Sequence, residues 1–103
     1  MPERTIRQEI MALIVDSTMT AKDLSQIIRI SEKEVYPHLE HIAKSLRNDK
    51  EKRLVIEPSR CYQCGFIFKE RRRLTSPSRC PRCRHEGISP PVFSIAKINR
   101  SSV

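Results

Sequence analysis

The chain is poor in the residues that mark several common classes of protein. Only 2 of its 103 residues are glycine, and none is tryptophan. The two separated glycines, Gly65 and Gly87, cannot build the glycine-rich loop that holds nucleotide phosphates. No apolar run is long enough to cross a membrane, and the serines and histidines follow no catalytic spacing. The composition therefore predicts neither an enzyme nor a partner of the membrane.

The cysteines are also few, but they stand in two pairs with no fifth cysteine. Cys61 and Cys64 form the first pair, Cys80 and Cys83 the second, and fifteen residues separate the pairs. Two residues between cysteines let the amides of a tight turn point at the thiolates, so the four sulfurs can complete a tetrahedral metal site. The spacing predicts one structural Zn²⁺ bound by all four cysteines. Iron and a redox disulfide pair are the alternatives.

Neighbouring residues fit this interpretation. Gly65 permits the positive φ that turns amides toward sulfur, whereas Arg84 stands at the matching position of the second pair. Phe66 and Phe68 are expected to cover the site. His85 could replace a ligand, but four cysteines already saturate the ion. Paired free thiols and the lack of a charged and then apolar leader predict a reducing, cytoplasmic setting.

Two further histidines, His38 and His41, lie three residues apart on a predicted helix. No carboxylate or thiol is placed to complete a second metal site with them, so both are expected to be solvated.

The positive charge belongs to the cysteine module. The net charge is +8, yet residues 1–58 hold ten basic and ten acidic side chains, while residues 59–90 hold eight basic and two acidic ones. Such a field favours a polyanion or an acidic protein surface as partner. The basic residues of the module are Arg60, Lys69, Arg71, Arg72, Arg73, Arg79, Arg82 and Arg84. They form either a solvated face or a phosphate-binding cluster.

Apolar residues at helical spacing predict three helices in the first half of the chain. The first covers residues 3–15, Thr20 with Asp23 opens the second, and Ser31 with Glu34 opens a third that ends near residue 48. The expected buried residues are Ile6, Ile10, Leu13 and Ile14, then Leu24, Ile27 and Ile28, then Val35, Leu39, Ile42 and Leu46. Pro37 predicts a kink or a loosened first turn in the third helix.

Two strands complete the prediction, at Leu54–Ile56 and within Val92–Ile98. Three helices followed by two strands is the order of an α+β winged helix-turn-helix, in which the strands pair as a wing. The predicted division is a helical core with the first wing strand (1–58), an inserted zinc ribbon (59–91), and the second wing strand with the C-terminal tail (92–103). The alternative is a separate ribbon that follows a three-helix bundle, with the last strand as part of the ribbon.

The third helix would read DNA in such a fold. Its exposed face is predicted to carry Lys33, Tyr36, His41 and Lys44, together with acidic residues that oppose phosphates. This face is mixed in charge, so the ribbon is expected to supply most of any affinity for DNA.

Four segments carry a resemblance to a known family: Thr20–Ser25, Val35–Leu39, Cys64–Phe66 and Pro77–Cys83. They are similar to an archaeal family of predicted transcriptional regulators with a helix-turn-helix fused to a zinc ribbon. The resemblance implies a winged helix with a rubredoxin-like ribbon, a DNA-binding role and an archaeal cytoplasmic setting.

The sequence thus predicts a zinc-binding regulator of transcription whose partner is double-stranded DNA. The predicted nucleic-acid-binding residues are Lys33, Tyr36, His41, Lys44, Arg71, Arg72, Arg73, Arg79, Arg82 and Arg84. The alternative is an adaptor whose ribbon docks on a protein of the transcription or RNA-processing machinery, and an iron-bearing electron carrier is a third possibility.

Overall fold

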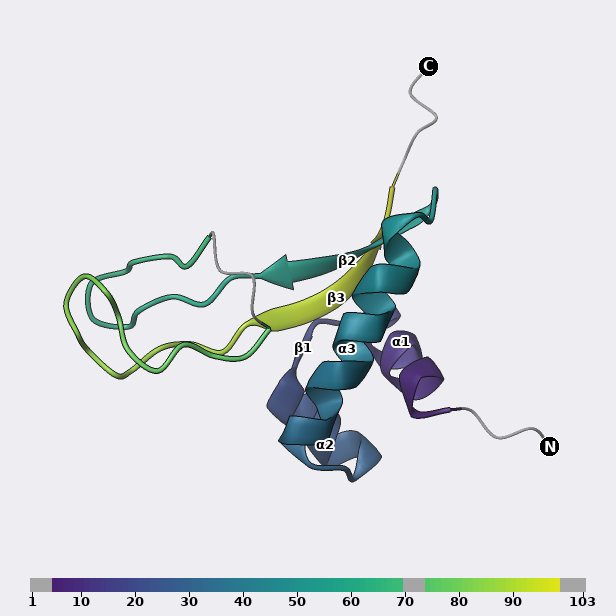
Figure 1. Ribbon diagram of the computed structural model, residues 1–103, viewed down its shortest axis with the longest axis horizontal. Coiled ribbons are helices and arrows are strands. Elements are labelled where there is room, and N and C mark those ends of the chain that lie inside the picture. Colours follow the sequence, from purple (N-terminus) through teal and green to yellow (C-terminus); the bar gives the residue numbers. More distant parts are fainter. Residues whose placement is uncertain (1–4, 70–73, 99–103) are drawn as a thin grey trace, which may run out of the picture.

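The computed structural model describes residues 5–69 and 74–98, which form three helices and one small antiparallel sheet (Figure 1). In chain order the elements are α1 (Ile6–Asp16), β1 (Met19–Thr20), α2 (Ala21–Ile28), α3 (Glu32–Arg47), β2 (Lys52–Glu57) and β3 (Val92–Lys97). The chain is therefore α+β, as predicted. None of the helices in the described part is long and apolar enough to cross a membrane.

Each helix begins at a capping box, because a side-chain oxygen takes up an amide that the first turn leaves free. The predicted caps Thr20 and Ser31 are both confirmed, with Asp23 and Glu34 as their partners. α1 begins later than predicted, since Thr5 is its N-cap. α3 is helical from Glu32 to Arg47 with Pro37 inside it, so the helix is not interrupted there, and the alternative of a kink at Pro37 stays a prediction.

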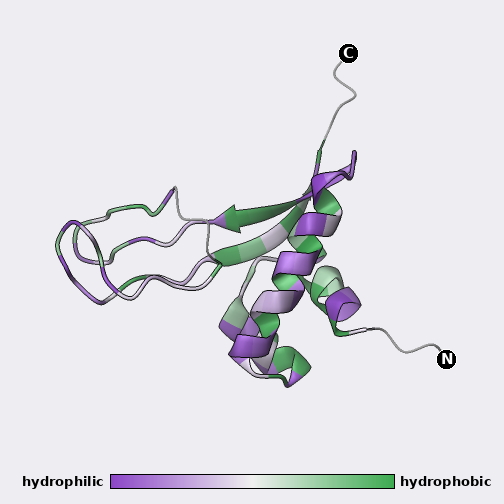
Figure 2. Ribbon diagram, in the orientation of Figure 1, coloured by the Kyte–Doolittle hydropathy of each residue, from purple (hydrophilic) through white to green (hydrophobic). Residues whose placement is uncertain are grey.

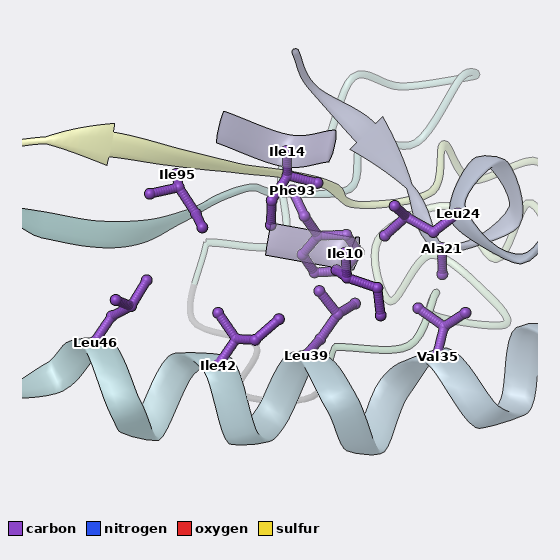
Figure 3. Packing of buried hydrophobic residues seen from close by; sticks show 10 residues of the cluster. All are labelled: Ile10, Ile14, Ala21, Leu24, Val35, Leu39, Ile42, Leu46, Phe93 and Ile95. Atoms are coloured by element: carbon purple, nitrogen blue, oxygen red, sulfur yellow. The ribbon is translucent and has the colours of Figure 1, made fainter. Parts of the chain in front are cut away.

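The three helices and β3 enclose one hydrophobic core (Figure 3). Its buried residues are Ile10, Ile14, Ala21, Leu24, Val35, Leu39, Ile42, Leu46, Phe93 and Ile95. The predicted stripe of α3 is confirmed completely. In α2 the prediction is confirmed for Leu24 but was wrong for Ile27, which is 53% exposed, because the helix turns Ala21 and not Ile27 toward the core. Hydrophobic and hydrophilic residues alternate along α3, as the green and purple bands of its ribbon show (Figure 2).

The sheet has the strand order β1-β3-β2, and both pairings are antiparallel. The predicted pairing of the two long strands is confirmed, with Leu54 opposite Ile95 and Ile56 opposite Phe93. β1 was not predicted, because two residues are too few to show an alternating pattern.

The cysteine module leaves the sheet at the end of β2 and returns at the start of β3. It projects away from the helices as a long lobe (Figure 1). The three-part division of the chain at residues 58 and 91 stays a prediction.

Candidate metal centre

The first cysteine pair sits in a tight backbone turn. The amide of Gly65 donates to the carbonyl oxygen of Cys61 over 3.0 Å, and the amide of Cys61 donates to the carbonyl oxygen of Phe66 over 2.9 Å. Gly65 has a φ of 79°, the left-handed conformation that was predicted for it.

The second pair repeats this turn bond for bond. The amide of Arg84 donates to the carbonyl oxygen of Cys80, and the amide of Cys80 to that of His85, both over 2.9 Å. Arg84 also adopts a positive φ, of 66°. The backbone of the turn therefore requires the left-handed conformation at this position, although the sequence offers no glycine there.

The two turns bring the four thiols together. The Sγ atoms of Cys61, Cys64, Cys80 and Cys83 all lie within 4.8 Å of one another. Two of these contacts, Cys61 to Cys83 and Cys64 to Cys80, span 3.5 and 3.6 Å. A tetrahedral ion with sulfur ligands at about 2.3 Å separates its sulfurs by about 3.8 Å. The cluster fits such an ion, and the four cysteines form a metal-binding site.

Burial is divided evenly between the pairs. The first cysteine of each pair, Cys61 and Cys80, is buried, and the second, Cys64 and Cys83, is exposed. The ion would therefore be shielded on one side by the ribbon and lie near solvent on the other.

The thiols influence one another electrostatically. Burial raises the pKa of Cys80, but backbone amides that donate to its sulfur, including that of Arg82 at 3.3 Å, outweigh it and lower the pKa to about 6. At Cys83 the amide of His85 favours the thiolate, yet burial and the three other cysteine sulfurs raise the pKa to about 12. Four thiolates this close are compatible only with a cation between them.

Further backbone hydrogen bonds hold the ribbon at its base. The amide of Tyr62 donates to the carbonyl oxygen of Gly87, and the amide of Ser89 donates to that of Arg60. Leu74 packs against the helical core. The two hydrogen bonds therefore link the segments of the ribbon to each other, and the contact of Leu74 links the ribbon to the helical core.

Other residues near the site have different roles from those of ligands. Phe66 and Phe68 are half-buried and contact each other edge to face, with ring centroids 5.0 Å apart. His85 lies outside the sulfur cluster, and its Nε2 would be 2.7 Å from a Cβ at Gly87, so the imidazole lies against that glycine.

The two histidines of α3 differ. His41 is exposed as predicted, but His38 is half-buried. Its Nδ1 is buried and has no hydrogen-bond partner among the described residues. The expectation of a solvated His38 was therefore wrong.

The predicted nucleic-acid-binding residues do not form one group. Lys33, His41 and Lys44 are exposed on α3, whereas Arg79, Arg82 and Arg84 are exposed on the ribbon. The ribbon lies off the opposite end of the sheet from α3 (Figure 1). Arg71, Arg72 and Arg73 lie outside the described residues.

Two of these side chains have contacts of their own. The hydroxyl of Tyr36 donates to Oε2 of Glu32 over 3.3 Å, and burial followed by the charge of Glu32 raises the pKa of this tyrosine. Its ring packs against the core. Arg79 forms a salt bridge with Glu86 at 3.8 Å, with both side chains largely exposed.

Sequence reasoning missed a basic group at the base of the sheet. Lys52 stands directly opposite Lys97 in the strand register, and Arg53 follows on β2. Charge counting did not reveal them, because residues 1–58 are neutral as a whole and Lys97 lies 45 positions further along the chain than Lys52. Only the register places the two lysines side by side.

Fold and site together define an α+β protein with a four-cysteine ribbon of the zinc-binding kind. Residues 5–55 match the PF0610-like N-terminal family, and residues 58–98 match the PF0610 rubredoxin-like zinc β-ribbon domain. The chain thus combines a PF0610-like N-terminal domain with a rubredoxin-like zinc ribbon. It is also similar to the solution NMR structure of protein PF0610 from Pyrococcus furiosus, with 28% identity and a TM-score of 0.75 over 95% of this chain and 97% of that one. No curated protein matches it.

Proposed function

We propose that this is a zinc-binding winged-helix protein that binds double-stranded DNA and regulates transcription. The observation that carries the proposal is the turn between α2 and α3. It comprises three residues, 29–31, and begins at Arg29, whose φ of 68° takes the place that glycine often fills in a helix-turn-helix. α3 would then be the recognition helix, and β2 with β3 would form the wing.

Zinc is the ion that the site supports best. Four thiolates in a rigid tetrahedral arrangement suit it, and they leave no position for water or substrate, which supports a structural rather than a catalytic role. Iron in the same cage would make the protein coloured, because ferric thiolates absorb visible light. Metal analysis together with an absorption spectrum of the purified protein decides between the two ions.

The proposed source of affinity for DNA is the ribbon. Residues 59–90 carry a surplus of six positive charges, whereas residues 1–58 carry none. Each phosphate that a cation neutralises adds about 0.9 to the slope of log affinity against log salt. Fluorescence anisotropy of a labelled duplex at several salt concentrations measures that slope.

Variants separate the contributions. Replacing Arg71, Arg72 and Arg73 with alanine should flatten the slope by about two to three units, and replacing Lys44 by about one at most. Arg7→Ala, on the exposed side of α1, is the matched control and should leave the slope unchanged. If the triple variant bound DNA with unaltered affinity, the three arginines would be solvated side chains and not phosphate contacts.

A second function, that of a protein-binding adaptor, is favoured by the acidic residues of α3. Glu32, Glu34 and Glu40 are exposed on the helix that would approach phosphates, and Tyr36 is held by Glu32. In this case the ribbon would dock on a component of the transcription or RNA-processing machinery. A protein without measurable affinity for duplex DNA at low salt would favour the adaptor.

A further inference from the structure

The outer edge of β2 is the feature from which the inference starts. β2 lies at the margin of the sheet, and no other described strand pairs with its far side. It nevertheless carries exposed apolar side chains, since Val55 is 41% and Ile56 40% exposed. An edge with such side chains readily takes up another strand.

The hydrogen bond next to the pairing shows which backbone groups point outward. The amide of Ile98 donates to the carbonyl oxygen of Glu51 over 2.7 Å, so Glu51 faces β3. Antiparallel strands alternate between residues that bond to the partner and residues that face away. Odd-numbered residues of β2 therefore bond to β3. The N–H and C=O groups of Leu54 and Ile56 point to the free edge, whereas the amide of Lys52 already donates to Oδ1 of Asp49 over 2.9 Å.

This set of free groups is matched by a second copy of the same strand. When two β2 strands run antiparallel about an axis at Val55, Leu54 of one copy opposes Ile56 of the other, and each pair can exchange two hydrogen bonds. Arg53 then stands opposite Glu57 of the other copy, twice. Neither residue has a salt-bridge partner within the described residues. The central residue, Val55, meets its own counterpart.

We propose that two copies of this chain associate through their β2 edges, with Val55 on the two-fold axis, to form one continuous six-stranded sheet. The contact is isologous, as closed dimers require. Each face of β2 is complementary to the same face of β2 in the other copy. Arg53, Val55 and Glu57 meet on the outer face, and Leu54 and Ile56 meet on the face that bears the core.

Neighbouring registers are excluded by the same reasoning. An axis at Leu54 sets Glu51 against Glu57, which is a like-charge pair. An axis at Ile56 sets Arg53 against Ser59 and Val55 against Glu57, so it forms no pair of opposite charges. A shift by one residue pairs groups that point away from each other. Of these axes, only the one at Val55 pairs Arg53 with Glu57 while Leu54 and Ile56 exchange hydrogen bonds. Lys52 then lies opposite Pro58 and makes no such exchange.

The inner side of the edge has room for the second copy. A depression of about 220 Å³ lies between α3 and β2, and it is lined by Ala43, Leu46, Leu54 and Ile56 together with Arg47 and Arg53. The other copy's Leu54 and Ile56 would cover its open side. A contact of one short strand is small, so the dimer should be transient, with a dissociation constant in the micromolar range or weaker.

Charge reversal provides the test, using the complete metal-loaded chain. Arg53→Glu and Glu57→Arg each replace two attractive pairs by two repulsive ones, and sedimentation should show self-association weakened roughly tenfold or more. The double variant carrying both changes restores the pairs and should recover wild-type association. Lys22→Glu, an equal charge change at an exposed residue of α2, should have no effect.

NMR gives an independent readout on the wild type. Within one chain the Hα atoms of Arg53 and Glu57 are about 13 Å apart, because each strand residue rises about 3.3 Å. A nuclear Overhauser effect between them at high protein concentration can therefore arise only between copies. A chain that stays monomeric at millimolar concentration, or a double variant no better than the single ones, would overturn the proposal.

Discussion

Removing the metal should unfold the ribbon but leave most of the helices intact. The buried side chains of the helical core come from α1, α2, α3 and β3, and none is a cysteine. In the ribbon, by contrast, the described backbone pairs only at two isolated bridges, and its buried side chains include Cys61 and Cys80. Modules shorter than about 40 residues rarely fold without a metal or disulfides.

The size of the destabilisation on metal removal follows from two free energies, that of metal binding and that of loop closure. A structural zinc ion supplies about 10 to 16 kcal/mol of apparent binding free energy, which matches or exceeds the whole stability of a typical domain, about 5 to 15 kcal/mol. Once the ribbon is unfolded, β2 and β3 are joined by a flexible loop of about 34 residues. Closing it costs about 3 kcal/mol, so pairing of the strands should weaken as well.

Chelation should therefore remove the protection of backbone amides in a defined order. Ribbon amides should lose protection from hydrogen exchange first, and those of β2 next, because Val55 and Ile56 are exposed. β3 should persist longer, because Phe93 and Ile95 are buried against the helices. Hydrogen exchange followed by NMR, before and after chelation, measures each step, and Cys80→Ser should reproduce the chelated state.

Three outcomes would refute this reasoning. Ribbon amides that keep their protection after the metal is stripped would show that the ion is not structural. Less than half an equivalent of metal in protein purified without added metal would show the same. Helices that melt together with the ribbon would contradict the independence of the core.

Three further predictions concern single residues. Gly65→Ala should destabilise the ribbon by about 1 to 2 kcal/mol. The new Cβ would meet no atom within 4 Å, so the cost comes from the positive φ alone. Arg84→Gly should stabilise the ribbon by a similar amount, and thermal melts measure both changes. Affinity for the metal should rise with pH and fall in acid, because the pKa of Cys83, about 12, keeps that thiol protonated at neutral pH until the ion displaces its proton; competition with a chelator at several pH values measures it. Backbone amides that donate to Asp49 lower the pKa of this carboxylate, so its contribution to stability is present above its unfolded pKa and is lost as pH falls through the lower folded value. Asp49→Ala should remove this acid dependence from the unfolding curve.

Local signals allowed much of the fold to be predicted. The capping boxes at Thr20 and Ser31 mark helix starts through contacts three residues apart, and the α3 stripe from Val35 to Leu46 repeats with the helical period. The metal centre was equally accessible, because the spacing of the cysteines within each pair already dictates the turn that presents sulfur.

The amino-acid sequence by itself thus determined the helices, the two long strands, the metal ligands and the surplus of positive charge in residues 59–90. Each of these depends on residues that are neighbours along the chain. The tertiary structure alone decided that Ile27 stays outside, that β1 joins the sheet, that Arg84 takes a left-handed conformation and that β2 is left as an open edge. These features depend on which distant segment lies opposite each residue, and no local pattern of side chains contains that information.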